Sequence, residues 1–171
     1  GDEVGNLLGT GRPVAGGLSG VCMKLATDVC QFRGEAIVKA DSEITDADIV
    51  ASNLVLWGDP ASNKILAKII GKLPLTWNSK EFRLGERELD PGRHVAVMIY
   101  PNPLNTKKYV VLNSGFTFRE YDYLNNARQV PKLPDYALID VSVPADARKP
   151  GGIVAAGFFD EQWKLPPHTL K

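Results

Sequence analysis

The chain has 171 residues, of which 44% are hydrophobic and 23% are charged, the balance of an ordinary globular domain. Its 20 basic and 20 acidic residues cancel, so the net charge does not favour nucleic acid or an anionic membrane surface as a partner. No apolar run approaches the roughly 18–20 residues of a membrane span. We therefore expect no nucleic-acid partner and no membrane insertion.

The predicted organisation is a single α/β domain over residues 18–165. A glycine-rich stretch at 1–17 has no apolar period, which indicates a loop or the remnant of an upstream region, and 166–171 is a tail. The chain begins at Gly1 without Met or a signal peptide, as processed proteins and excised pieces do. Low cysteine use fits the cytoplasm and equally fits a bacterial periplasm, so it excludes neither compartment.

Helical spacing of apolar residues predicts a first helix over 18–32, with Cys22 on its buried face. Eight residues of helix separate Cys22 from Cys30, about 12 Å of rise, which is too far for a disulfide. We therefore expect free thiols. With His94 and His168 as the only histidines, no zinc pattern is present, and we predict no metal and no cofactor.

The middle of the chain alternates buried strands and helices. The segment 44–49 predicts a short helix with Thr45 as its N-cap, and 53–58 predicts an apolar central strand. A helix should then begin at Asp59-Pro60 or at Ser62 and end before Pro74.

A small β excursion at 75–93 follows, and then strands at 95–100 and 109–113. Only eight residues connect these two strands, which predicts an antiparallel pair with the prolines of "YPNPLN" in the turn. A helix after 115, a buried strand at 136–141 and a last strand at 153–159 complete the chain.

These elements predict an α/β fold of the three-layer, Rossmann/flavodoxin-like type, with a mixed sheet that has a parallel core and antiparallel additions. Strands 53–58, 109–113 and 136–141 should be parallel, because helices connect them. Strands 95–100 and 153–159 should be the antiparallel members.

The turn after strand 53–58 is the first candidate site. Asp59, Ser62 and Asn63 stand at a helix N-terminus, where they can either cap the helix or bind a ligand. The chain has neither GxGxxG nor GxxxxGK[ST], so dinucleotide and P-loop chemistry are not supported. The capping interpretation is favoured over the ligand turn, because Asp before Pro is a common helix start.

Ser114 is the second candidate, because it follows strand 109–113 as a catalytic serine follows its strand in an α/β-hydrolase. The surrounding residues do not fit GxSxG, since Gly115 stands one place too early. His94 precedes an antiparallel strand, and we expect it at the opposite end of the sheet from Ser114. A catalytic triad built on Ser114 is therefore the less favoured interpretation.

The two candidates combine into one predicted ligand site. Parallel strands end at the same edge of a sheet, where ligands of open α/β folds bind. The polar side chains expected to converge there are those of Asp59, Ser62, Asn63, Asn113, Ser114 and Thr117. The Asp59 carboxylate favours a hydroxyl-rich or cationic small molecule over a phosphate.

Three segments, "LWGDPASN" at 56–63, "YPNPLN" at 100–105 and "VVLNSG" at 110–115, carry a family resemblance that covers roughly 32–165. The chain resembles the C-terminal domain of large bacterial exported proteins with an upstream α/β-hydrolase of the prolyl oligopeptidase or dienelactone hydrolase type. The resemblance implies a non-catalytic accessory domain, with an upstream or partner hydrolase and no catalytic residue in this chain. An independent serine hydrolase using Ser114 and a purely structural module are the alternatives.

Overall fold

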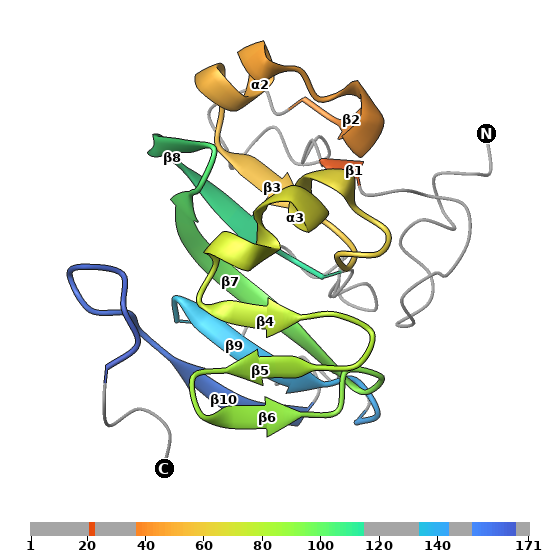
Figure 1. Ribbon diagram of the computed structural model, residues 1–171, viewed down its shortest axis with the longest axis vertical. Helices are drawn as coiled ribbons and strands as arrows, with labels where there is room; N and C mark the ends of the chain where they lie inside the picture. Colours follow the sequence, from red (N-terminus) through yellow and green to blue (C-terminus); the bar gives the residue numbers. More distant parts are fainter. Residues whose placement is uncertain (1–20, 23–36, 115–133, 144–151, 167–171) are drawn as a thin grey trace, which may run out of the picture.

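The computed structural model describes residues 21–22, 37–114, 134–143 and 152–166. Its main feature is a seven-stranded mixed sheet (Figure 1). The strands, in spatial order, are β10 (Gly152–Gly157), β9 (Tyr136–Asp140), β7 (His94–Asn102), β8 (Asn105–Leu112), β3 (Leu54–Leu56), β1 (Val21–Cys22) and β2 (Lys39–Ala40).

The strand directions agree with the prediction. β3 and β8 pair in parallel, with Leu56 opposite Leu112, whereas β7 pairs antiparallel with both β8 and β9. β9 therefore runs in the same direction as β3 and β8, and β10 runs against it. Among the described strands β3–β8 is the one parallel pair, so the predicted parallel core is reduced to two neighbouring strands.

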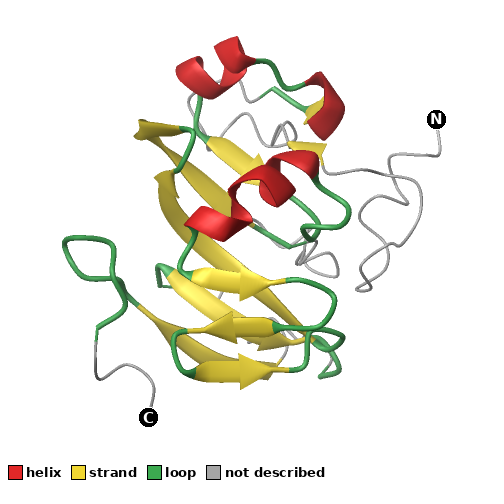
Figure 2. Cartoon of the chain, viewed as in Figure 1, coloured by secondary structure: helices red, strands yellow, loops and turns green. Residues whose placement is uncertain are grey.

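One face of the large sheet is covered by a layer that contains both helix and strand. This layer consists of α3 (Lys64–Ile69), the 3-10 turn η2 (Ile70–Lys72) and a three-stranded sheet of β4 (Leu75–Trp77), β5 (Phe82–Leu84) and β6 (Arg87–Leu89). Figure 2 shows this small sheet beside α3, in front of the large sheet. The predicted β excursion at 75–93 is thus confirmed, and it covers the sheet where a helix would lie in a regular α/β fold.

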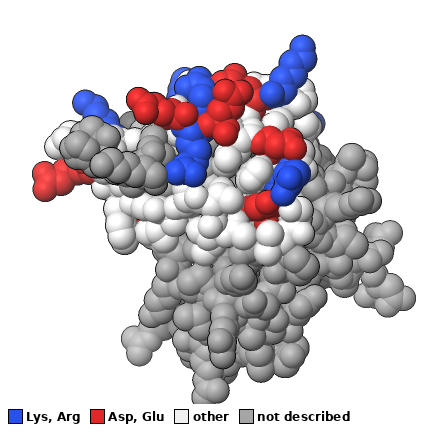
Figure 3. Space-filling view, turned by 90° about the horizontal axis from the view of Figure 1, so that it is seen from below, with Lys and Arg blue, Asp and Glu red and all other residues white. Residues whose placement is uncertain are grey.

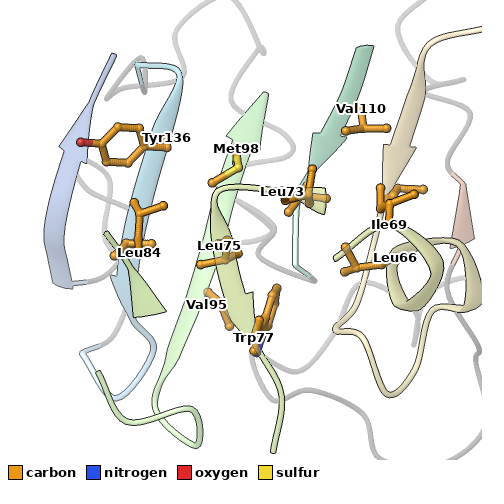
Figure 4. Close-up of a cluster of buried hydrophobic side chains, with 14 of the residues drawn as sticks. Leu66, Ile69, Leu73, Leu75, Trp77, Leu84, Val95, Met98, Val110 and Tyr136 are labelled. Carbon is orange, nitrogen blue, oxygen red and sulfur yellow. The ribbon is translucent and has the colours of Figure 1, made fainter. Parts of the chain in front are cut away.

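The hydrophobic core lies between these two layers. Leu66 and Ile69 of α3 and Leu84 of β5 are fully buried, and Figure 4 shows them in one cluster with Met98 of β7 and Tyr136 of β9. β3 buries one face only. Leu54 and Leu56 are 2% and 1% exposed, whereas Val55 between them is half-buried. β3 is an internal strand of the sheet, as predicted, since it pairs with β8 on one side and β1 on the other, but only one of its faces is fully buried.

The predicted cap at Thr45 is present. The Thr45 hydroxyl accepts a hydrogen bond from the Asp48 N–H at the start of α2 (Asp46–Ala51), and the Asp48 carboxylate accepts one from the Thr45 N–H. Lys39 of β2 donates to both carboxylate oxygens of Asp48 at 2.7 and 2.9 Å. Those bonds, first from Lys39 and then from Thr45, hold the pKa of Asp48 well below its ordinary value.

One predicted helix differs from the structure in the residues that the structure describes. Val21 and Cys22 form the strand β1 and pair with β2 and with Leu56 of β3, so the helix predicted over 18–32 is wrong at these residues. Sheet pairing supplied by distant residues overrides helical spacing here. The rest of that helix and the helix predicted after 115 lie outside the described residues.

Candidate functional site

The joint between β3 and α3 is a tight turn over 58–63. Gly58 opens it with φ +91°, a conformation that L side chains rarely adopt, and a Cβ built there would lie 2.5 Å from Ser62 Oγ. The Asp59 carbonyl then accepts hydrogen bonds from the N–H groups of Ser62 and Asn63 at 3.1 and 2.9 Å. The turn is therefore closed on itself before the helix begins.

Asp59 and Ser62 hold this turn through their side chains. The Asp59 carboxylate accepts from the N–H groups of Ala61 and Ser62 at 2.9 and 2.8 Å, and the Ser62 hydroxyl accepts from the Asp59 N–H at 3.0 Å. The carboxylate thus caps the turn rather than the helix. A helix start at Asp59-Pro60 or Ser62 was wrong by a few residues, because these bonds fix a separate turn first.

Asn63 is the actual N-cap of α3. Its Oδ1 accepts from the Leu66 N–H at 2.9 Å, and its Nδ2 donates to the Trp57 carbonyl at 2.9 Å. The residue is 1% exposed. Asn63 therefore joins the helix N-terminus to the end of β3, with both ends of its amide in use.

Ser114, which follows β8, is the second part of the candidate site. It is 8% exposed and has φ +50°, which is uncommon outside glycine. Its hydroxyl donates a hydrogen bond to the Ala96 carbonyl of β7. The backbone conformation resembles the strained turn of a hydrolytic serine, but the hydroxyl proton is directed to a backbone acceptor.

The sheet register brings the two candidate segments together. Leu56 lies opposite Leu112, and the Asn113 N–H donates to the Leu56 carbonyl at 2.8 Å. The next carbonyl along β3, that of Trp57, accepts from Asn63. The Asn63 side chain and the Asn113 N–H therefore bind consecutive carbonyls at the end of β3, on the side of the sheet where β3 and β8 both finish. Thr117, the remaining predicted site residue, lies outside the described residues.

His94 lies at this same edge, so its predicted position at the opposite end of the sheet was wrong. It begins β7, and an antiparallel strand begins where its neighbours end: His94 is opposite Asp140, the last residue of β9. Its Nδ1 lies 2.8 Å from the Asp90 carbonyl, which requires a proton on Nδ1, and its ring stacks on Phe82 at a centroid distance of 6.4 Å. His94 is 9% exposed, and its ring packs against Phe82 of the small sheet.

An ion pair completes this edge beside His94. Arg93 Nη2 donates to Asp140 Oδ2 at 2.8 Å and to Ser142 Oγ at 3.0 Å. The hydroxyl and N–H of Ser142 both donate to Asp140, and these bonds, followed by the charge of Arg93, lower the pKa of the Asp140 carboxyl. The Arg93 side chain of this pair is 56% exposed, whereas that of Asp140 is 13% exposed.

The sequence did not reveal the part played by Asp41. This residue of the 3-10 turn η1 (Asp41–Glu43) is 4% exposed, and its Oδ2 accepts from the Lys64 N–H at 2.7 Å, at the first position of α3. The two residues are 23 positions apart, so no local sequence pattern predicts this bond. A carboxylate at this helix start opposes the approach of a second anion.

The polar groups of the site are thus hydrogen-bonded within the protein. The oxygens or amides of Asp59, Ser62, Asn63 and Ser114 all have partners within the fold. Within the described ranges, no group of three or more metal-ligating side chains occurs, and no helix is long and apolar enough to span a membrane. Figure 3 shows acidic and basic side chains next to one another on the face seen from below.

Comparison of the chain with models of known protein families, with curated proteins and with solved structures gives no match.

Proposed function

We propose that this chain is a non-catalytic accessory domain associated with a secreted or periplasmic α/β-hydrolase, to which it is joined or against which it packs. The observation that supports this proposal best is the bond from the Ser114 hydroxyl to the Ala96 carbonyl. A nucleophilic serine must pass its proton to a base, and a backbone carbonyl is not one. The resemblance of 32–165 to domains that follow such hydrolases supports the same function.

The ligand of such a domain would bind at the edge where β3 and β8 end. The Asn63 side chain and the Asn113 N–H bind the carbonyls of Trp57 and Leu56 there, and Asp59 and Ser62 lie in the turn that precedes Asn63. Because Asp41 and Asp59 are both at this end, we propose a hydroxyl-rich or cationic small molecule in preference to a phosphate. The lone pairs of the Asp59 carboxylate that the turn leaves unused would accept hydrogen bonds from it.

We also propose that the complete domain is a three-layer α/β fold of the Rossmann/flavodoxin-like type. The common direction of β3, β8 and β9 and the position of α3 on one face support it. Backbone chemical shifts over 115–130 test this proposal. A helix there agrees with a second helical layer, and extended shifts contradict it.

A second candidate function is serine hydrolysis by Ser114, and two observations favour it. Ser114 has the positive φ of a strained turn directly after a strand, and His94 lies at the same edge of the sheet. Against it stand the carbonyl partner of Ser114 and the packing of the His94 ring on Phe82.

A fluorophosphonate probe distinguishes the two functions, because it labels only activated serines. We expect no labelling of the purified chain and no turnover of p-nitrophenyl esters or prolyl peptides above the uncatalysed rate. Labelling and turnover that are both lost in Ser114→Ala but kept in Ser62→Ala would establish the hydrolase and exclude the accessory function.

The DNA sequence around the gene tests the association with a hydrolase separately. The reading frame upstream of residue 1 should encode a GxSxG segment, or a neighbouring frame should. If it does, the hydrolase is assayed with and without residues 37–166, and the accessory function predicts a change in KM, kcat or thermal stability. A hydrolase that is unaffected in all three, or a locus without GxSxG, would contradict the proposal.

A further inference from the structure

The strand β10 forms one edge of the large sheet, and its outer side is unpaired among the described residues. β10 pairs with β9 on its inner side, and Figure 4 shows it as the outermost strand. An open edge presents a row of N–H and C=O groups, which another extended strand can bind. The chemistry of this surface therefore selects a β-strand as the partner.

The side chains of β10 do not oppose such pairing. The sequence Gly152–Gly157 has no charged residue and no proline, two of the devices that block an edge strand. A single irregularity lies between Ile153 and Ala155, and Arg87 of β6 donates to the Val154 carbonyl at this point. The stretch from Ala155 onward is regular, so it is the part able to pair.

The register of β10 shows which side chains a partner would cover. Ile153 lies opposite Ile139 and Ala156 opposite Ala137, so Ile153 and Ala156 share one face of the sheet. Both are exposed, and Ile153 is 39% exposed. Phe158, two residues after Ala156 and just beyond the strand, is 66% exposed. This edge thus carries apolar residues that the described part of the chain leaves exposed.

We propose that β10 is a self-association surface at which a second copy of this chain adds its own β10, antiparallel and centred on Ala156. In this register Ala156 faces its equivalent, and Ala155 faces Gly157 of the partner copy, which places small residues opposite small ones. Each residue then meets one from the same face of the sheet, as continuous pairing requires. Because the strand is uncharged, no like charges are opposed, and such a twofold contact is self-complementary.

Substitutions of opposite charge at Ala156, the centre of the contact, test the proposal. The unmodified chain should be a dimer by light scattering at its highest soluble concentration. Ala156→Lys and Ala156→Glu each place two like charges directly opposite one another, which disfavours pairing, so each variant alone should dissociate more readily by at least several-fold. Mixing the two variants should restore a dimer that contains one copy of each.

The matched control is Val50→Lys, which adds the same charge on α2 at a side chain that is 67% exposed and distant from β10 in Figure 1. This variant should dimerise like the unmodified chain. Oxidation gives a second readout: Ala156→Cys should crosslink two copies, because the facing Cβ atoms lie about 4.5–5.5 Å apart, whereas Val50→Cys should not. A monomeric unmodified chain, or Ala156 variants that dimerise unchanged, would overturn the proposal.

Discussion

The hydroxyl of Ser114 donates a hydrogen bond to the backbone carbonyl of Ala96 and so ties the end of β8 to the first part of β7. The two residues are 18 positions apart, and the bond is buried. It stands where a hydrolase would hold its nucleophile, and it fixes the turn that follows the sheet. The strained backbone of Ser114 is thus accompanied by an interaction that only a hydroxyl makes there.

Two substitutions separate the hydrogen bond of Ser114 from its backbone strain. Ser114→Ala keeps the positive φ and leaves the Ala96 carbonyl without its donor, so it should lower the free energy of unfolding by about 1–3 kcal/mol. Ser114→Gly also loses the bond but relieves about 1–2 kcal/mol of left-handed strain. Urea denaturation should therefore find the glycine variant more stable than the alanine variant. The reverse order would contradict this account of the turn.

Gly58 is the residue that permits the turn between β3 and α3. Gly58→Ala should lower the free energy of unfolding by about 1–3 kcal/mol, because φ +91° is strained for alanine and because the new Cβ meets Ser62 Oγ. Gly71→Ala is the matched control, since its added Cβ meets nothing within 4 Å. That change should be neutral or stabilise by about 0.4–1 kcal/mol. Thermal unfolding of the two variants in parallel decides the point, and equal effects would contradict it.

Asn63 should contribute more to stability than an exposed asparagine with similar bonds. Asn63→Ala removes the N-cap of α3 and leaves the Trp57 carbonyl without its donor, so we expect a loss of about 2 kcal/mol in the free energy of unfolding. Asn78 also binds two N–H groups, but in an exposed turn, and Asn78→Ala should cost about 0.5 kcal/mol. Denaturant midpoints at unchanged m-values measure both changes, and an Asn63 effect no larger than that of Asn78 would refute the cap.

Asp48 should make the free energy of unfolding depend on pH in the acid range. Lys39 and Thr45 lower its folded-state pKa, so the unfolded chain binds a proton more readily than the folded chain. Its stabilising effect is fully present above the unfolded value of about 3.9 and is lost as pH falls from there toward the folded pKa. Melting temperatures between pH 6 and pH 2 should fall less steeply for Asp48→Asn than for the unmodified chain. Parallel curves would show that the Lys39 contact contributes nothing in solution.

Much of the fold could be predicted from local patterns. Fully apolar segments gave the strands β3, β7 and β9, and the short connection between β7 and β8 indicated their antiparallel pairing. The structure extends both strands until only Pro103 and Leu104 remain in the turn. The cap at Thr45 was equally visible, because a capping box involves residues three apart in the sequence.

The candidate site was predictable in position but not in its bonding. Asp59, Ser62 and Asn63 were recognised as helix-start residues, since such residues favour turns and caps wherever they occur. The assignment of the cap to Asn63 depends on the Trp57 carbonyl, to which Asn63 Nδ2 donates, and the order of these local bonds is not encoded in residue type.

By itself the sequence determined which segments are buried strands, where α2 begins and that β7 turns back along β8, because these features follow from periodicity and from contacts between near neighbours. Tertiary structure decided that Val21 and Cys22 form a strand, that the Asp41 carboxylate binds the first N–H of α3 and that His94 lies at the same end of the sheet as Ser114. Each of these depends on residues far apart in the chain. The free energy of such contacts exceeds the weak preferences of a local segment, so only the assembled sheet could fix them.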